Sequence, residues 1–350
     1  MTGRSVAEPG SGAPEPDREA GFVLLSVLLA AALFMAAAAS FAVKSQLLAM
    51  QAANRLEQAR SEAIVDGAAL FAIHALQPHL GPAAAPPPAE PANAGTPAAA
   101  RRRPPLPLDG TPVACALADG RALELAAIDQ GGLLDLNAAP PEMIMDVLGA
   151  AGLDAETALR IAGAVADFRD EDDVPAAGGA SERALYREAG KPFGPRNAPF
   201  LDAAELVQLP GLSPELAQRF LPLATVFSGR ASLDPATMDR RARALFPKEI
   251  DALDALRRWR KPSPREALAI ESRLRRPDGT VAALRHALAT VADPLAISGA
   301  LPGAAPSTAT TPAAPRILQW QTAVEAPSPA PAPSTSPLCK SLVAALGLGL

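Results

Sequence analysis

A long apolar stretch near the start of the chain gives way to an amphipathic pattern. Residues 22–43 carry no ionisable side chain, and a helix of that length spans the roughly 30 Å hydrocarbon layer of a membrane. Beyond Val43, apolar residues recur at helical spacing as far as Pro78. The pattern predicts one helix over 22–77, half in a membrane and half against a folded domain. A cleaved signal peptide is the alternative, although its apolar core is normally shorter and follows basic residues.

After the helix, the polar and apolar pattern predicts a small antiparallel sheet. Apolar runs flank Asp119-Gly120, which favours two strands joined by a type I′ turn. A second hairpin is expected through Asp278-Gly279, and the segment around Trp320 is expected to add a closing strand. The segment that begins near residue 222 is read as a strand that returns to this sheet and leads into a helix.

Two segments between the expected strands share one plan, and they begin at Asn137 and Asn197. Each reads as a short helix, a Gly-Leu turn, and a second helix that starts at an acidic or hydroxyl cap. A helix-hairpin-helix DNA module is the alternative, but its second turn glycine is replaced by Asp154 in one copy and Ser213 in the other. The net charge of −5 also argues against nucleic-acid binding, which needs clustered Lys and Arg.

The stretch between these two helical units carries a specific resemblance. Its ordered elements are an aromatic residue, an Asp-rich loop, a Gly-Ala pair near a glutamate, a tyrosine and an Asn-x-Pro-Phe segment: Phe168, Asp170, Asp172, Gly179-Ala180, Glu182, Tyr186 and Asn197–Phe200. With DLNAAP at 135–140 and ELVQLPGLSPEL at 205–216, the chain resembles the K-type minor pseudopilins of bacterial type II secretion systems. Ser181 separates the Gly-Ala pair from Glu182, which is a departure from the family pattern.

The resemblance extends to the start of the apolar helix. Pilin-like proteins are cut by a prepilin peptidase after a glycine, which would make Gly21 the last leader residue and Phe22 the first, methylated, mature residue. Most pilins carry a glutamate at the fifth mature position, where it neutralises the N-terminal amine of a neighbour. This chain has Ser26 there, so the resemblance implies a place at the end of a filament. An ordinary membrane anchor is the alternative, and Glu19 and Ala20 stand where such leaders are usually basic.

An acidic cluster lies in the Asp-rich loop, at residues 167–173. Its carboxylates cannot all remain ionised side by side without solvent or a cation, and ligands that offer only oxygen suit calcium. K-type pseudopilins are understood to bind calcium in this helical region, which supports a site at Asp170, Asp172 and Asp173, completed by Glu182. A solvated acidic loop without metal is the alternative.

Other chemistry finds little support. The three histidines are dispersed, and no GxSxG, HExxH or P-loop spacing is present, so catalysis is not expected. Cys115 and Cys339 have no zinc-site spacing. A single bridge between them would suit an oxidising compartment, but Cys339 lies in a segment rich in proline and serine that is expected to be disordered.

The predicted fold class is α+β: a long N-terminal transmembrane and amphipathic helix on a small antiparallel sheet, with a large SAM-like helical insertion between strands. The resemblance implies a non-enzymatic subunit in the inner membrane, with most of the chain in the periplasm. Its implied partners are the I- and J-type minor pseudopilins, the major pseudopilin, the inner-membrane secretion platform and the prepilin peptidase. The predicted parts are a leader (1–21), the helix (22–77), a Pro/Ala-rich linker (78–105), the first sheet segment (106–136), the helical insertion (137–221), the rest of the sheet domain (222–321) and a Pro/Ser-rich tail (322–350).

Overall fold

The computed structural model describes residues 18–81, 104–176, 178, 181–247, 249–250, 253–291, 315–322 and 331–348. The predicted leader before residue 18, most of the predicted linker and the Gly179-Ala180 pair lie outside these residues. The chain separates into two units, Met1–Ala59 and Arg60–Leu350. The fold is α+β, as predicted.

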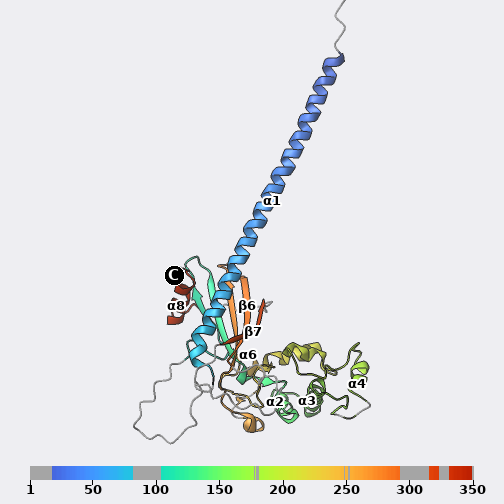
Figure 1. The fold of residues 1–350 in the computed structure, drawn as a ribbon, viewed down its shortest axis with the longest axis vertical. Coiled ribbons are helices and arrows are strands. Elements are labelled where there is room, and N and C mark those ends of the chain that lie inside the picture. The colour runs from blue at the N-terminus through green and yellow to red at the C-terminus, as the bar shows by residue number, and fades with distance from the viewer. Residues whose placement is uncertain are drawn as a thin grey trace, which may run out of the picture. The chain divides into compact units, whose positions relative to one another are not determined.

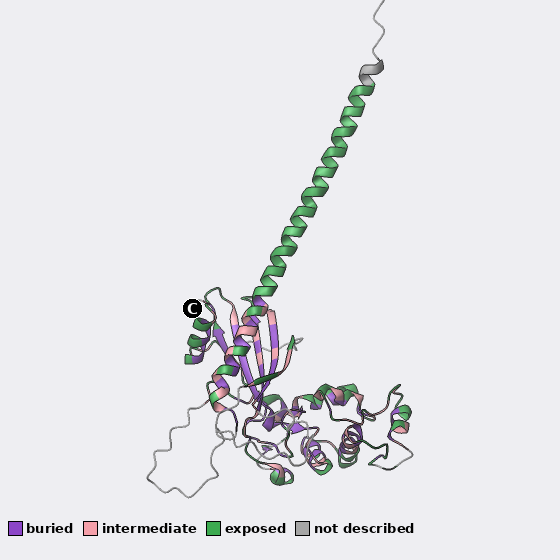
Figure 2. Cartoon of the chain, in the orientation of Figure 1, coloured by how far each residue is buried: buried purple, intermediate pink, exposed green. Residues whose placement is uncertain are grey.

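Helix α1 runs from Arg18 to Leu76 without a break, which confirms the predicted long apolar helix (Figure 1). The side chains of residues 22–60 are all exposed (Figure 2). The most apolar window of 18 residues has a mean hydropathy of 2.6 and no buried residue. By length and composition, therefore, α1 is able to cross a membrane. It ends where Pro78 enters the 3-10 turn η1 (Gln77–His79), because proline has no backbone N–H to continue the helix.

Within the second unit, the last turns of α1 pack into a hydrophobic core. Val65, Ala68, Ala69, Ala72 and Leu76 are completely buried, and their spacing of three or four residues places them on one helix face. They share this core with side chains from the sheet strands. Three of the five are alanines, which let the helix backbone come close to the sheet.

The main sheet has five antiparallel strands, with no other strand in it among the described residues, in the order β1-β2-β5-β6-β7. The strands are β1 (Val113–Ala116), β2 (Ala122–Asp129), β5 (Ala267–Arg275), β6 (Val281–Thr290) and β7 (Arg316–Thr322). Leu123, Leu125 and Ile270 face the core shared with α1, whereas Ile128 and Ala269 belong to the core on the other face. This alternation is the expected two-residue period of strands. The two predicted hairpins and the predicted closing strand are confirmed.

The first hairpin turn differs from the predicted type I′ geometry, and the second hairpin, for which no turn type was predicted, has the same form. Gly120 and Gly279 have positive φ angles of 82° and 83°, but Asp119 and Asp278 do not have positive φ. Each turn closes with an N–H of the glycine bonded to the carbonyl three residues earlier, at Leu117 and Arg276. Each hairpin loop is therefore longer than the two-residue loop of a type I′ turn, and within it only the glycine takes the left-handed conformation. The aspartates accept bonds from the backbone two residues on, which favours this turn over type I′.

A helical head lies between β2 and β5 and runs from Gln130 to Trp259. Its first helical pair is α2 (Pro141–Ala150) and α3 (Ala155–Arg169), and its second is η4 (Ala203–Gln208) and α5 (Pro214–Phe220), with α4 (Glu182–Glu188) between the pairs. The shorter elements are η3 (Gln130–Gly132), η5 (Leu221–Leu223), α6 (Arg240–Arg243) and η7 (Asp254–Trp259). The duplicated plan is therefore present, although the first element of the second copy is a 3-10 helix.

The segment expected to return to the main sheet does not join it. Strand β4 (Ala224–Thr225) instead pairs in parallel with β3 (Leu134–Asp135), in a separate two-stranded sheet. The buried carboxylate of Asp135 explains this local pairing, because it accepts bonds from Ser228 and Gly229 just beyond β4. The helix that follows is only the single turn α6.

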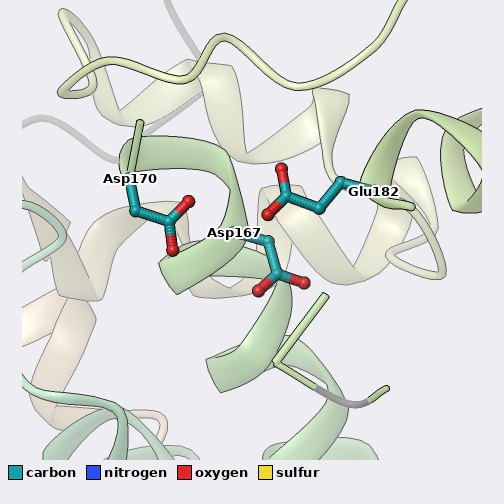
Figure 3. Close-up of side chains that lie close together, drawn as sticks. All are labelled: Asp167, Asp170 and Glu182. Atoms are coloured by element: carbon teal, nitrogen blue, oxygen red, sulfur yellow. The ribbon is translucent and has the colours of Figure 1, made fainter. Parts of the chain in front are cut away.

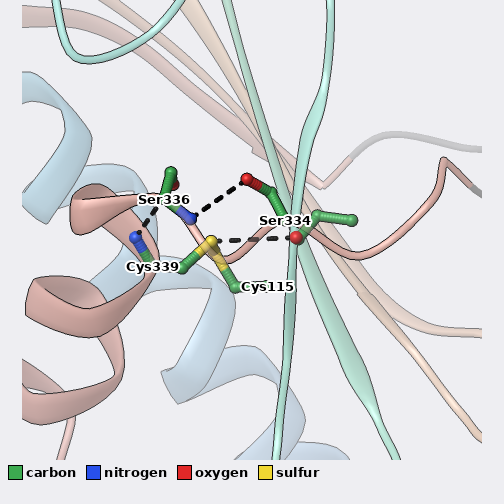
Figure 4. Close-up of a disulfide and its surroundings, with 5 residues drawn as sticks. Cys115, Ser334, Ser336 and Cys339 are labelled. Atoms are coloured by element: carbon green, nitrogen blue, oxygen red, sulfur yellow. Dashed lines mark hydrogen bonds between the residues drawn. A yellow bond between two sulfur atoms is a disulfide. The ribbon is translucent and has the colours of Figure 1, made fainter.

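The C-terminal segment corrects the prediction of a disordered tail. Pro337–Ala345 forms helix α8, whose Leu338, Leu342 and Val343 are buried in the core shared with α1. A disulfide joins Cys339 on α8 to Cys115 on β1 (Figure 4). The backbone N–H of Ser334 also bonds to Ala114 of β1 at 2.7 Å.

Candidate functional site

Three acidic side chains from two helices of the head meet beside α3. Asp167 lies in the last turn of α3, Asp170 caps the C-terminal end of that helix, and Glu182 is the first residue of α4. Ser181 fixes the start of α4, because its hydroxyl accepts a bond from the Ala184 N–H at 3.1 Å. One carboxylate oxygen from each of the three acidic residues lies within 4.8 Å of the others (Figure 3).

The carboxylate of Glu182 is buried without a hydrogen-bond partner. The residue is 1% exposed, and neither of its oxygens is bonded within the described part of the chain. One oxygen of Asp170 and the hydroxyl of Tyr186, one helical turn beyond Glu182, are in the same condition. Buried polar groups normally have a partner, so this group of orphaned oxygens points to a ligand.

The raised pKa values of the three carboxyl groups also indicate a site for a cation. Burial, and then the negative charges of Asp170 and Asp167, raise the pKa of Glu182 from 4.5 to about 7. Burial also raises the pKa of Asp167 and of Asp170, and neighbouring carboxylates add to each rise. A divalent cation would remove this repulsion, because it favours the ionised form of every carboxylate around it.

The donor set fits calcium. Three carboxylates supply oxygen only, and calcium accepts six to eight oxygens, including backbone and water, in flexible geometry. Zinc prefers nitrogen and sulfur ligands, and none of the three residues offers these atoms. Asp167, Asp170 and Glu182 are therefore the residues that would hold the ion.

The predicted ligands are only partly brought together. Asp170 and Glu182 are in the group, whereas Asp172 and Asp173 are outside it and bond to the backbone N–H groups of Val174 and Arg183 at 2.8 and 3.2 Å. Asp167 belonged to the acidic cluster in the sequence but was not among the predicted ligands. Its spacing of three residues from Asp170 was the available signal, because residues i and i+3 share a helix face.

An asparagine clamp holds the two helical units together beside the site. The side chain of Asn137 donates to the carbonyl of Phe200 at 2.9 Å and accepts from the N–H of Phe200 at 2.8 Å. Phe200 in turn stacks on Phe168 of α3, with ring centroids 4.2 Å apart. The Asn137 clamp therefore joins the start of the first helical unit of the head to the start of the second helical unit.

We predict that Asn137→Ala lowers the free energy of unfolding of the head by about 2–3 kcal/mol, because two backbone groups lose their partner. Denaturant unfolding followed by fluorescence of Trp259, which packs against the core of the head, measures this change. Asn54→Ala makes the same chemical change at an exposed position on α1 and should leave the transition unchanged. Equal transitions for both variants would contradict the clamp.

The turns of the two helical units serve helix capping. Gly152 and Gly211 have positive φ angles of 93° and 71°. Asp154 accepts a bond from Thr157 N–H and Ser213 from Leu216 N–H, so each caps the helix after its turn. Each cap therefore occupies one backbone N–H in the first turn of its helix, which is the kind of group that binds a phosphate at a helix N-terminus.

The predicted processing site lies in α1. Gly21 is within the helix, and Phe22 is 73% exposed. The Ser26 hydroxyl donates to its own helix, at the carbonyls of Phe22 and Val23, 3.0 and 2.9 Å away. Ser26 therefore places a neutral side chain, bonded within its own helix, at the position where most pilins carry a carboxylate.

A long apolar helix whose last turns pack on an antiparallel sheet, with a helical head inserted between two strands, is the architecture that the resemblance to pseudopilins led us to expect. Residues 123–229 match the family model of type II secretion system protein K. The chain is 28% identical over 247 residues to the type II secretion system protein K of Klebsiella pneumoniae, covering 68% of this chain and 73% of that protein. The chain is therefore similar to type II secretion system protein K (GspK), which is a structural secretion component and not an enzyme.

A solved structure supports the fold. The crystal structure of the GspK–GspI–GspJ complex from the enterotoxigenic Escherichia coli type 2 secretion system matches with a TM-score of 0.52. The match covers 79% of this chain and all of that chain, at 14% identity.

Proposed function

We propose that this minor pseudopilin sits at the tip of the pseudopilus, supports its assembly, and thereby supports export of folded proteins across the outer membrane. The partners are the I- and J-type minor pseudopilins, as in the complex that the fold resembles. The tip position is inferred from the presence of Ser26, and not a glutamate, at the fifth position after the proposed cleavage site. An interior subunit needs a carboxylate there for its neighbour's amine, whereas a terminal subunit has no neighbour ahead of it.

The apolar helix is consistent with a single inner-membrane anchor, and we place the rest of the chain in the periplasm. The disulfide between Cys115 and Cys339 supports this placement, because disulfides persist in oxidising compartments such as the bacterial periplasm. Peptidase cleavage between Gly21 and Phe22 and contact with the inner-membrane secretion platform complete the proposed assembly route.

Restoring a carboxylate tests the tip position. Full-length Ser26→Glu and Ser26→Ala variants would each be co-expressed with the I- and J-type pseudopilins and purified from membranes by a tag. We expect Ser26→Ala to recover both partners normally, because the hydroxyl bonds only to its own helix. Ser26→Glu should recover them about tenfold less, since an unpaired charge in the apolar bundle costs several kcal/mol. Equal recovery by both variants would mean that an amine lies ahead of residue 26, which would contradict a terminal subunit.

We propose further that calcium occupies the group formed by Asp167, Asp170 and Glu182. The support is the buried, unbonded carboxylate of Glu182 facing two other acidic side chains. A bound ion would tie the start of α4 to the end of α3. We propose a structural role for the ion, because its three ligands join two helices.

A further inference from the structure

A cavity of about 330 Å³ lies between the helical head and the face of the main sheet opposite α1. Two neighbouring rows of sheet residues line it. One row is largely apolar and runs from Ala269 through Leu288 to Gln319, and the other is polar and runs from Glu271 through His286 to Gln321. The cavity is at the small end of ligand sites, so it suits one long side chain better than a large molecule.

The charges around the cavity are predominantly negative. Asp202, Asp239 and Glu271 contribute carboxylates, and Arg241 contributes a guanidinium. Arg241 is shared between two of them, bonding to Asp239 at 3.0 Å and Glu271 at 2.9 Å. Burial lowers the pKa of the His286 imidazole, so this ring adds no compensating charge near neutral pH. The cavity therefore favours a cationic group.

Beside the cavity, β7 forms an edge of the sheet. No segment in the described part of the chain pairs with its outer side. Its sequence RILQWQT has no proline or lysine, its only charge is at its first residue, Arg316, and Ile317 is 45% exposed. Exposed edges of monomeric proteins are usually blocked by such residues, so an edge of this composition is suited to pairing with another strand. Gln319 and Gln321 extend from this edge to the cavity.

We propose that β7 binds an extended segment of a partner protein, which adds as a further strand and places a basic side chain in the cavity. Backbone pairing along β7 supplies the affinity, and the carboxylates of Asp202 and Glu271 supply the selectivity. Alternate residues of an added strand face the same side as Gln319 and Gln321, so one lysine or arginine reaches the cavity while its neighbours face away.

The test uses full-length protein in detergent and two synthetic peptides as long as β7. Both alternate threonine and valine, and they differ only at the centre, which is arginine in one and its neutral isostere citrulline in the other. Fluorescence anisotropy should show the arginine peptide binding about tenfold more tightly. Glu271→Gln should reduce this preference to about threefold or less, whereas Glu142→Gln, at an exposed position on α2, should retain it.

Hydrogen exchange separates strand pairing from simple charge attraction. The arginine peptide should slow exchange of backbone amides in β7 and leave those of β1, at the other edge, unchanged. A thermal unfolding midpoint of Glu271→Gln equal to that of the wild type confirms that the variant is folded; if it is not, Asp202→Asn replaces it. No saturable binding at about millimolar peptide, no arginine preference in the wild type, or no protection in β7 would each overturn the proposal.

Discussion

Replacing Cys115 and Cys339 together by alanine should lower the free energy of unfolding of the unit beyond residue 60 by about 3–5 kcal/mol. The disulfide links residues 224 apart, and closing so long a loop removes much of the unfolded chain's entropy. It also holds α8 against the core, so the α8 amides should exchange faster in the variant. Urea unfolding followed by fluorescence of Trp259 and Trp320 measures the loss.

The control for this prediction is chemical reduction. A reductant should shift the transition of the wild type toward that of the double variant, and it should leave the double variant itself unchanged. If the wild type and the variant unfold at the same urea concentration, α8 is held by its apolar contacts alone. That result would contradict the stabilising role of the bridge.

Calcium should raise the unfolding temperature strongly at pH 8 and weakly at pH 5.5. Without metal, the pKa of Glu182 is raised from 4.5 to about 7. Between about pH 4.5 and pH 7, the folded protein therefore holds a proton on Glu182 that the unfolded chain has already released. Stability of the metal-free protein therefore falls as pH rises from about 4.5 to 7. At pH 8, calcium at a hundred times its dissociation constant adds about 2.7 kcal/mol, or about 5 °C or more for a domain of this size. Below pH 7, protons compete with the metal.

Two matched variants on α4 test which carboxylate is responsible. Glu182→Gln should abolish saturable calcium binding in calorimetry and should make the metal-free protein less sensitive to pH. Glu188→Gln makes the same change at an exposed position on the same helix and should bind calcium as the wild type does. Unchanged calcium binding by Glu182→Gln, or no binding by the wild type at about millimolar metal, would refute the calcium site.

Local patterns predicted much of the fold. The apolar run, the Pro78 stop, the two Asp-Gly hairpins and the Asn-started helical pairs all depend on residues close in sequence. Predictions of elements that depend on partners distant in sequence were wrong, or the elements were missed. Strand β4 has only two residues, and its pairing with β3 depends on Asp135, about ninety positions earlier.

Helix α8 was missed because prolines and serines before it dominated the composition. The signal was nevertheless present, since Ser336 caps the helix, Pro337 opens it, and Leu338 and Leu342 are spaced for one buried face. The candidate metal site remains a prediction, and the acidic group lies within a few residues of the ligands predicted for it. Sequence identified the acidic loop, but only the packing of α4 against α3 selects Asp167 over Asp172 and Asp173.

The central claim is that α1 enters the membrane as a processed pilin-type helix and bears the head as the end of a filament. Mass spectrometry of the mature N-terminus, on protein purified from membranes that contain the prepilin peptidase, tests it most directly. We expect a chain that begins at a methylated Phe22. A chain that keeps Met1, or one cut near Ala42, would show an ordinary anchor or an exported domain and would contradict the claim.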